Sequence, residues 1–294
     1  IDILINPDAR TPSEMFPNEM SGKPFPVLKE VKGKAIEAGK DKPVNLLIEG
    51  DNYHSLAVLN FTHQESIDLI YIDPPYNTGN KNFIYNDSFV DREDSFRHSK
   101  WLAFMEKRLK LARNLLKKDG VIFMSIDDNE FAQLKLLTDE IFDENNFVID
   151  VIWNSRKSVS SDAIVSLNHN HTFIYAKDIN KLRESVKKGL KFKLPTNEEK
   201  FSNPDNDSRG HWTPDPFEAA GVRKNLSYPI TNPNTGKVYY PVNGRHWAVL
   251  EEQYFKLLKD NRMVFGKNGK GKPQRKRFLS EAMKKGLTPK SIWD

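Results

Sequence analysis

The most constraining feature of this chain is a short apolar run, residues 67–72, that leads directly into Asp73, Pro74, Pro75 and Tyr76. An apolar run of this length is typical of a buried strand. In open α/β sheets, ligands bind just outside the carboxyl ends of strands, where loops present polar groups above a rigid floor. The sequence therefore predicts a ligand-binding turn that begins at Asp73.

The residue types of this turn suit a planar amine. Proline has a fixed φ and no N–H donor, so carbonyls in the turn can face a ligand. The Asp73 carboxylate and the Pro74 carbonyl would each accept one N–H bond from an exocyclic amino group, and Tyr76 would stack on the ring. The alternative is an ordinary strand-ending turn with a half-buried Tyr76. Such a turn needs neither the second proline nor the aromatic ring, so binding is the favoured interpretation.

Strand-like and helix-like segments alternate around the turn. The predicted helix at 99–118 carries apolar residues every three or four positions, and Asp119-Gly120 is expected to end it. This alternation predicts an α/β fold with a doubly wound, mostly parallel, Rossmann-like sheet and helices on both faces. The predicted strands are 44–49, 67–73, 121–126, 148–153 and 172–176, and the other predicted helices are 53–61 and 130–142.

Prolines and charge divide the chain into three expected parts. Residues 1–43 are predicted to form an arm or linker, residues 44–180 the catalytic domain, and residues 181–294 a basic, irregular region. Residues 1–180 carry 21 Lys and Arg against 28 Asp and Glu, whereas residues 181–294 carry 24 against 12. This asymmetry favours a module that faces nucleic acid beside a catalytic domain; uneven solubilising charge is the alternative.

The basic region interleaves cations with aromatic rings, a pattern that favours a surface for double-stranded DNA. Trp212 and Trp247 are expected in the core of this region rather than on bases. The glycine cluster at 266–272 has no apolar strand before it and no helix after it, so it is interpreted as a basic loop and not as a nucleotide-binding turn. The predicted DNA contacts are Arg209, Lys267, Lys270, Lys272, Arg275, Lys276 and Arg277.

Acidic residues follow two other predicted strands. Asp51 follows residues 44–49 after the single residue Gly50, where it can cap the next helix or contact a ligand, and both interpretations stay open. Asp127 and Asp128 follow the strand at 121–126. They are expected to cap the next helix or support the site, rather than to act as acid and base.

Histidines and a tryptophan lie near these strands. His169 and His171 share one face of a predicted strand, but a metal site needs at least a third ligand and the chain has no cysteine, so no metal site is predicted. Ser99-Lys100-Trp101 is expected either beside the bound ring or in a structural role.

The 294 residues are enough for a buried core and one or two domains. The absence of cysteine excludes disulfides and thiolate metal sites within this sequence. No apolar stretch approaches eighteen residues and no signal-peptide pattern is present, so the expected location is the cytoplasm.

The string from Asp73 to Gly79 resembles the catalytic motif of amino-group DNA methyltransferases. It is most similar to the adenine-N6 enzymes of the beta class, in which the catalytic motif precedes the cofactor loop, and to the methylation (Mod) subunit of type III restriction-modification systems. The similarity continues through Gly50-Asp51-Asn52, Phe83-Ile84-Tyr85-Asn86-Asp87, Ser99-Lys100-Trp101, Gly120-Val121-Ile122, Ile126-Asp127-Asp128 and Asn203-Pro204-Asp205-Asn206-Asp207.

This resemblance implies transfer of a methyl group from S-adenosylmethionine to N6 of adenine in DNA. It implies catalytic roles for Asp73, Pro74, Pro75 and Tyr76, and cofactor contacts from Asp51, Asn52 and Asp73. The implied partners are double-stranded DNA, a restriction (Res) subunit and a second copy of the chain.

Two other functions remain open from the sequence. One is methylation of N4 of cytosine, and the other is a catalytically incomplete module for DNA binding or assembly. In the family the glycine-rich cofactor loop comes near the C-terminal end, and no such loop is present here. It is therefore expected after residue 294.

Overall fold

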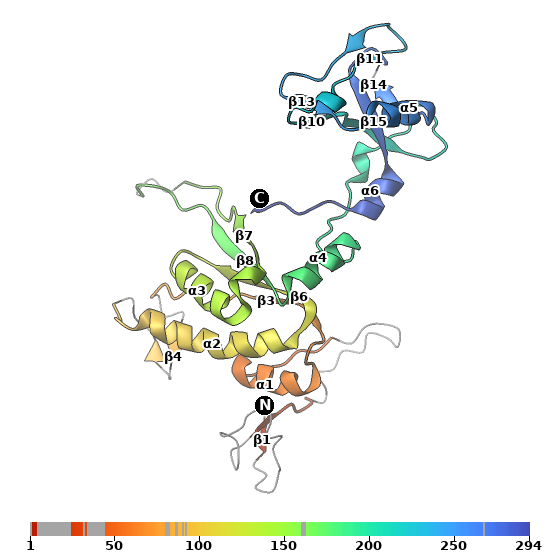
Figure 1. Ribbon diagram of the computed structural model, residues 1–294. Coiled ribbons are helices and arrows are strands. Elements are labelled where there is room, and N and C mark those ends of the chain that lie inside the picture. The colour runs from red at the N-terminus through yellow and green to blue at the C-terminus, as the bar shows by residue number, and fades with distance from the viewer. Residues whose placement is uncertain are drawn as a thin grey trace. The chain divides into compact units, whose positions relative to one another are not determined.

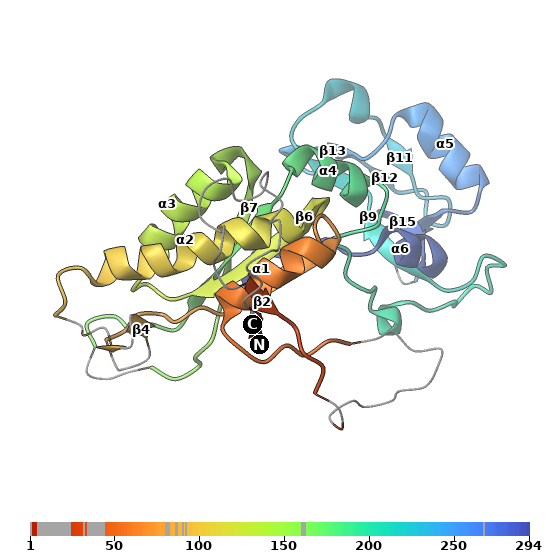
Figure 2. The same ribbon diagram turned by 90° about the horizontal axis from the view of Figure 1, so that it is seen from below.

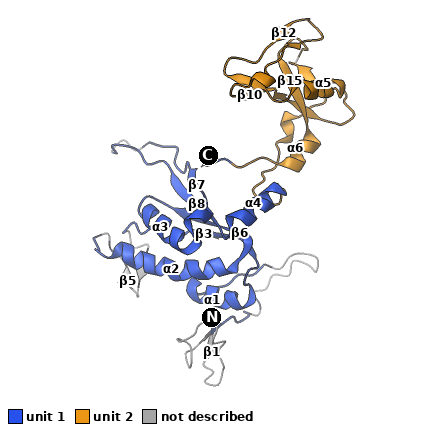
Figure 3. Cartoon of the chain, in the orientation of Figure 1, with its two compact units in different colours: residues 1–188, 290–294 blue, residues 189–289 orange. Residues whose placement is uncertain are grey.

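The computed structural model describes residues 2–4, 25–31, 33, 45–79, 83–85, 88–89, 91, 93–159, 163–266 and 268–294. The chain forms two compact units, residues 1–188 with 290–294 and residues 189–289 (Figure 3). Most of the predicted arm at 1–43 lies outside the described residues. Within them, no helix is long and apolar enough to cross a membrane.

The first unit is built on a five-stranded sheet with the strand order β16–β7–β8–β6–β3 (Figure 1). β3 is parallel to β6, β16 is parallel to β7, and β8 is antiparallel to both of its neighbours. Four of the five strands therefore point the same way, which confirms the predicted α/β class and mostly parallel sheet. The strands are β3 (Ile67–Ile72), β6 (Leu116–Ile126), β7 (Phe147–Trp153), β8 (Asn170–Ala176) and β16 (Ile292–Trp293).

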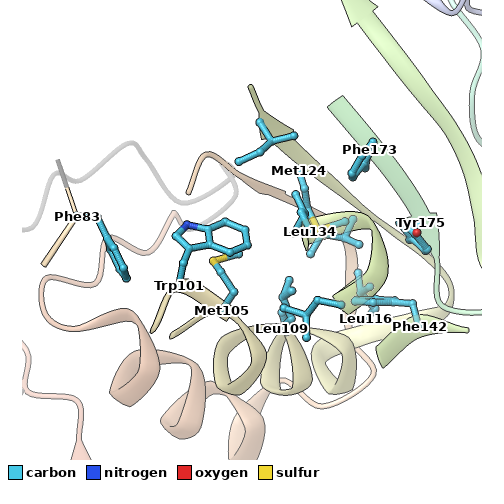
Figure 4. Close-up of a cluster of buried hydrophobic side chains, with 14 residues drawn as sticks. Phe83, Trp101, Met105, Leu109, Leu116, Met124, Leu134, Phe142, Phe173 and Tyr175 are labelled. Atoms are coloured by element: carbon cyan, nitrogen blue, oxygen red, sulfur yellow. The ribbon is translucent and has the colours of Figure 1, made fainter. Parts of the chain in front are cut away.

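Helices α2 (Arg97–Leu115) and α3 (Phe131–Phe142) pack against one face of this sheet, and α1 (Asn52–Thr62) packs on α2 (Figure 2). The predicted helices at 53–61 and 130–142 are thus confirmed. A core of buried side chains from α2, α3, β6 and β8 fills the space between helices and sheet (Figure 4). On the other face of β3, Leu69 and Tyr71 are 53% and 60% exposed.

The predicted helix at 99–118 ends earlier than expected, because Leu116 takes an extended conformation and begins β6. Leu116 is still fully buried, so it fits the apolar period of the helix although it is not helical. Gly120 does not end the helix either. A Cβ on Gly120 would lie 3.0 Å from the Ile67 carbonyl oxygen, so glycine permits the close approach of β6 to β3.

The predicted strand at 44–49 is wrong over its described part. Residues 45–49 form no strand, and Leu47 is 94% exposed. A strand requires a hydrogen-bonded neighbour. β3 is an edge strand of the sheet, and residues 45–49 do not pair with it. The apolar run 46–48 therefore resembles a strand only in its composition.

Several short elements complete the first unit. The helix α4 (Ile179–Lys187) packs near β6, and β16 returns residues 292–293 to the sheet. Both elements belong to the first unit, whereas we expected the catalytic domain to end at residue 180. Backbone hydrogen bonds from Ile152 and Asn154 hold the returning segment beside the sheet. The remaining elements are β1 (Asp2–Leu4), β2 (Phe25–Val27), β4 (Ile84–Tyr85), β5 (Ser88–Phe89) and the 3-10 turn Glu144–Asn146.

The second unit contains a three-stranded antiparallel sheet with the order β14–β15–β9. Trp247 is fully buried and Trp212 is 8% exposed, which confirms that both are core residues. The elements are β9 (Trp212–Pro216), β10 (Glu218–Ala220), β11 (Ile230–Thr231), β12 (Val238–Tyr239), β13 (Arg245–Trp247), β14 (Met263–Phe265), β15 (Pro273–Phe278), α5 (Glu251–Lys259), α6 (Leu279–Lys285) and the 3-10 turns Glu198–Lys200 and Lys224–Leu226.

Candidate active site

The turn that begins at Asp73 lies at the carboxyl end of β3, as its sequence predicts. Ile72 pairs with Met124 of the parallel strand β6, so the two strands end at the same edge of the sheet. Asp73 is exposed, whereas Tyr76 is half-buried and packs against the core of the first unit. Burial, followed by a hydrogen bond to the Asp73 carboxylate, raises the pKa of Tyr76. Tyr76 therefore stays a neutral phenol at neutral pH.

A buried tryptophan fixes the middle of the turn. Trp101 of α2 is fully buried, and its Nε1 donates a 2.7 Å hydrogen bond to the Pro75 carbonyl. The Pro75 carbonyl is thus engaged, while the Pro74 carbonyl has no hydrogen-bond partner among the described residues. Of the Ser99-Lys100-Trp101 cluster, Trp101 accordingly has a structural role and supports the turn.

Asn77 fixes the end of the turn. It is 1% exposed and has a φ of 55°, a left-handed conformation that asparagine tolerates better than most residues. Its Nδ2 donates to Oε1 of Glu130, and the Glu130 side chain is likewise 1% exposed. The same oxygen lies 2.8 Å from Nδ1 of His98 in α2. Glu130, at the start of α3, therefore ties the turn to two helices.

Sequence reasoning missed Glu130 and His98 as supports. The sequence pattern near Asp127 gives no sign that Glu130 is buried. Asp and Glu are almost never fully buried unless they are paired, so a glutamate at this position is expected to be exposed. Only the packing of α3 against α2 brings Glu130 beside Asn77.

Asp51 caps a helix. Its Oδ1 accepts hydrogen bonds from the backbone N–H groups of Tyr53 at 2.8 Å and His54 at 3.4 Å, and its Oδ2 accepts one from Arg108 at 3.0 Å. The capping interpretation is confirmed. Asn52, the first residue of α1, is exposed. A cofactor contact by Asp51 or Asn52 remains a proposal.

The two aspartates after β6 differ in their surroundings. Asp127 accepts bonds from both the backbone and the side-chain nitrogen of Asn129, which braces the loop, and its charge contributes to the raised pKa of Tyr76. Asp128 is 56% exposed and lies 3.4 Å from Nε2 of His171. Neither side chain caps α3, whose N-cap residue is Glu130.

Lys276 requires a correction among the predicted DNA contacts. Its side chain is fully buried in β15, and its ammonium group bonds Asp205 and, at 2.9 Å, Asp207. The ammonium also lies 5.1 Å from the centre of the Trp212 ring. A buried cation with two carboxylate partners cannot reach a phosphate, so Lys276 is removed from the set of DNA contacts.

The other predicted cations lie in varied surroundings. Arg209 bonds Asp207 at 2.8 Å and Asp260 at 3.0 Å, and its guanidinium stacks on a phenylalanine ring, so most of its donors are engaged within the unit. Lys270 and Lys272 are exposed. Arg275 and Arg277 are half-buried, and Lys267 lies outside the described residues.

The glycine cluster at 266–272 connects β14 to β15, two antiparallel strands. Side chains of Asn232, Asn234 and Tyr239 donate hydrogen bonds to its carbonyls. A Cβ on Gly271 would lie 3.0 Å from the Cα of Gly266, so the two ends of the loop approach closely. This is a hairpin loop and not a strand-to-helix turn, in agreement with its interpretation as a basic loop.

Replacement of Lys276 by Met should destabilise the second unit, because Asp205 and the buried Asp207 would both lose the ammonium group that bonds them, and Arg209 would remain to Asp207 alone. We expect the Tm to fall by about 5–10 °C. The exposed Lys270→Met variant loses the same charge and should keep the Tm within about 2 °C of the parent protein. Calorimetry of the whole chain measures both, and equal Tm values would contradict the buried ion pair.

Acid should weaken the same cluster. Bonds from Arg209 and then Lys276 hold the pKa of Asp207 well below its usual range. A carboxyl whose pKa is lowered by folding stabilises the protein above its unfolded pKa of about 3.9, and that contribution is lost as the pH falls below this value. We expect the Tm of the second unit to fall below about pH 4, and less steeply in Asp207→Asn. Calorimetry from neutral to acid pH tests this, and parallel profiles for the two proteins would be inconsistent with it.

Comparison with known proteins identifies the family of this chain. The model of the N6_N4_Mtase DNA methylase family matches residues 67–239. The chain is 39% identical over 284 residues to the type III restriction-modification enzyme StyLTI Mod subunit of Salmonella typhimurium, a match that covers 85% of this chain and 40% of that protein. This chain belongs to the N6_N4_Mtase DNA methylase family.

Other relatives match shorter parts. The EcoP15I Mod subunit of Escherichia coli is 37% identical over 50% of this chain and 26% of its own length. The type II methyltransferase M.KpnI of Klebsiella pneumoniae is 42% identical over 44% of this chain and 31% of its own length. The chain thus spans less than half of each of these relatives.

Solved structures are more distant. The PvuII DNA methyltransferase, which is cytosine-N4-specific, has a TM-score of 0.31 and 18% identity over 42% of this chain and 46% of that chain. The family assignment therefore rests on sequence.

Proposed function

We propose that this chain is the catalytic-motif half and DNA-facing part of an adenine-N6 DNA methyltransferase of a type III restriction-modification system. The observation that carries the proposal is the turn at Asp73. An exposed carboxylate and a carbonyl that has no hydrogen-bond partner in the described part of the chain lie at the end of a strand, and Trp101 and Glu130 hold the turn by hydrogen bonds. Two fixed acceptors of this kind suit the two N–H bonds of an exocyclic amine.

Asp73 and Pro74 would hold the amine of a flipped base by accepting its two N–H bonds. The reaction needs electron density on that nitrogen, and two acceptors placed in advance favour it without reorganisation in the transition state. Tyr76, kept neutral, would stack on the base and would cost no desolvated charge. Positioning therefore supplies most of the catalysis, with the surplus proton passing to Asp73 or to water.

S-adenosylmethionine would supply an electrophilic methyl group on its sulfonium sulfur. The exposed Asp73 carboxylate fits a cationic, hydroxyl-rich cofactor, and Asp51 keeps half of its side-chain surface exposed although it caps α1. Asp51, Asn52 and Asp73 are the proposed cofactor contacts. The relatives are longer than this chain, and the glycine-rich part of the cofactor site is proposed to lie outside these 294 residues.

Double-stranded DNA is the proposed substrate, and residues 189–289 the proposed recognition region. This unit carries 19 Lys and Arg against 10 Asp and Glu. With Lys276 excluded, the exposed pair Lys270 and Lys272 is the best-supported phosphate contact in the glycine loop, and Arg209, Lys267, Arg275 and Arg277 are retained as secondary candidates. Cations in a loop can neutralise phosphates without reading bases.

The further partners follow from the relatives. Mod subunits of type III enzymes are among them, so a restriction subunit is the proposed partner. A second copy of the chain is proposed from the family resemblance alone. Action on DNA would place the protein in the cytoplasm.

Methylated nucleosides test the proposed function. The full-length protein is incubated with S-adenosylmethionine and duplex DNA, and the hydrolysed DNA is analysed by mass spectrometry. N6-methyldeoxyadenosine is the expected product. N4-methyldeoxycytidine would instead support the cytosine-N4 alternative, and DNA binding without any methylated nucleoside would support an inactive binding or assembly module.

Salt dependence tests the DNA surface. In Lys270→Ala/Lys272→Ala we expect the slope of log K against log salt to flatten by about 1–2, since each lost phosphate contact is worth about 0.9. Lys110→Ala/Lys117→Ala removes the same charge from the first unit and should leave the slope unchanged. Fluorescence anisotropy at several salt concentrations measures DNA binding and gives the slope for each variant. Equal slopes in the two variants would place the glycine loop away from DNA.

A further inference from the structure

Three potential metal ligands converge where β6 ends and β8 begins. One ligand atom each from Asp128, His169 and His171 lies within 4.8 Å of the others. The antiparallel register explains this meeting. Ile126 pairs with His171, so the residue two positions after Ile126 comes opposite the residue two positions before His171. The sequence shows the two histidines, but the third ligand is distant in sequence and only the pairing of the strands supplies it.

The imidazole of His171 lies between two carboxylates, one on each ring nitrogen. Its Nδ1 lies 2.9 Å from Oδ2 of Asp150 in β7, while the Phe131 ring packs 4.3 Å from it, centre to centre. With an ion bound, a neutral imidazole that donates its Nδ1 proton to Asp150 would direct its Nε2 lone pair to the ion, beside Asp128, whose Oδ1 lies 3.4 Å from Nε2. A carboxylate behind a metal-binding histidine is the usual second partner in such sites.

The remaining ligands are accessible. The Asp128 side chain is 56% exposed and His169 is partly exposed, so an ion can enter from solvent. The His169 and His171 rings are 5.0 Å apart, centre to centre. The two imidazoles and the Asp128 carboxylate together offer a donor set of two nitrogens and one oxygen.

We propose that Asp128, His169 and His171 bind a single zinc ion, with Asp150 positioning His171 and a water molecule as the fourth ligand. Two histidines and one carboxylate suit zinc, whereas magnesium prefers a shell of oxygen atoms. The bound ion joins the loop after β6 to the start of β8. That loop also carries Glu130, which accepts a hydrogen bond from Asn77 at the end of the turn. By holding the loop, zinc would therefore stabilise Glu130 and, through it, the turn at Asp73. The argument for zinc binding does not rest on the proposed methyl transfer, because its ligands are recognised from their own geometry.

Zinc titration of the whole chain tests the site. The protein is prepared without a polyhistidine tag, stripped with a chelator and titrated with zinc chloride by calorimetry. We expect one ion per chain and a higher Tm with zinc, but not with an equal concentration of magnesium. Cobalt in place of zinc should give the visible absorption of a tetrahedral site.

The variants separate this site from other histidines. His171 is buried against Phe131, so the changes are made at the more exposed ligands. His169→Ala and Asp128→Asn should each weaken zinc binding at least tenfold and abolish the rise in Tm. His211→Ala, an exposed histidine of the second unit, should bind as the parent protein does. Absence of zinc binding, unchanged affinity in both ligand variants, or an equal rise in Tm with magnesium would each overturn the proposal.

Discussion

Asp73→Ala in the full-length protein is expected to lower the rate of methyl transfer by at least about 10²–10³-fold, the usual cost of removing a group that stabilises developing charge. Binding to duplex DNA should stay within about twofold of the parent protein, because phosphate contacts dominate affinity. Folding should survive, since the Asp73 side chain is exposed and contributes no core packing.

Asp68→Ala is the matched control for this prediction. Asp68 lies in β3, the strand that leads into Asp73, and its exposed side chain forms an ion pair with the surface residue Lys117, so its loss should leave the rate nearly unchanged. The rates are measured with tritiated cofactor under single-turnover conditions. Parent-like transfer by Asp73→Ala would remove Asp73 from the catalytic turn.

Trp101→Ala should have the largest effect on stability. The side chain is fully buried in the core of the first unit, and replacing such a residue by alanine costs about 3–5 kcal/mol. Urea unfolding followed by circular dichroism measures the change. A loss below about 1 kcal/mol would mean that the core around α2 is not packed as described.

Trp101→Phe separates packing from the hydrogen bond to Pro75. Phenylalanine keeps much of the buried volume but leaves the Pro75 carbonyl without its donor. We expect the variant to remain folded, with a free energy of unfolding lowered by about 1–3 kcal/mol. Its rate of methyl transfer should fall further than its DNA binding. An unchanged rate would show that the bond to Pro75 does not position the turn.

The segments with strong local patterns were predictable from sequence. The helices near 53–61 and 130–142 and the strand before Asp73 have an apolar period or an apolar run that a single conformation satisfies. The predictions failed where a residue pattern fits two conformations. Residues 45–49 resemble a strand in composition but have no hydrogen-bonded neighbour, and Leu116 fits the helical period although it begins β6.

The sequence by itself determined which residues make up the turn, because Asp73, the two prolines and Tyr76 are adjacent in the chain and need only one strand to place them. Tertiary structure decided which side chains hold the turn in place and which cations are buried rather than exposed to solvent. Trp101 and Glu130 reach it from α2 and the start of α3, and Lys276 is buried between two aspartates far from it in sequence. Local pattern records side-chain type and spacing, whereas burial and partners depend on which segments pack together.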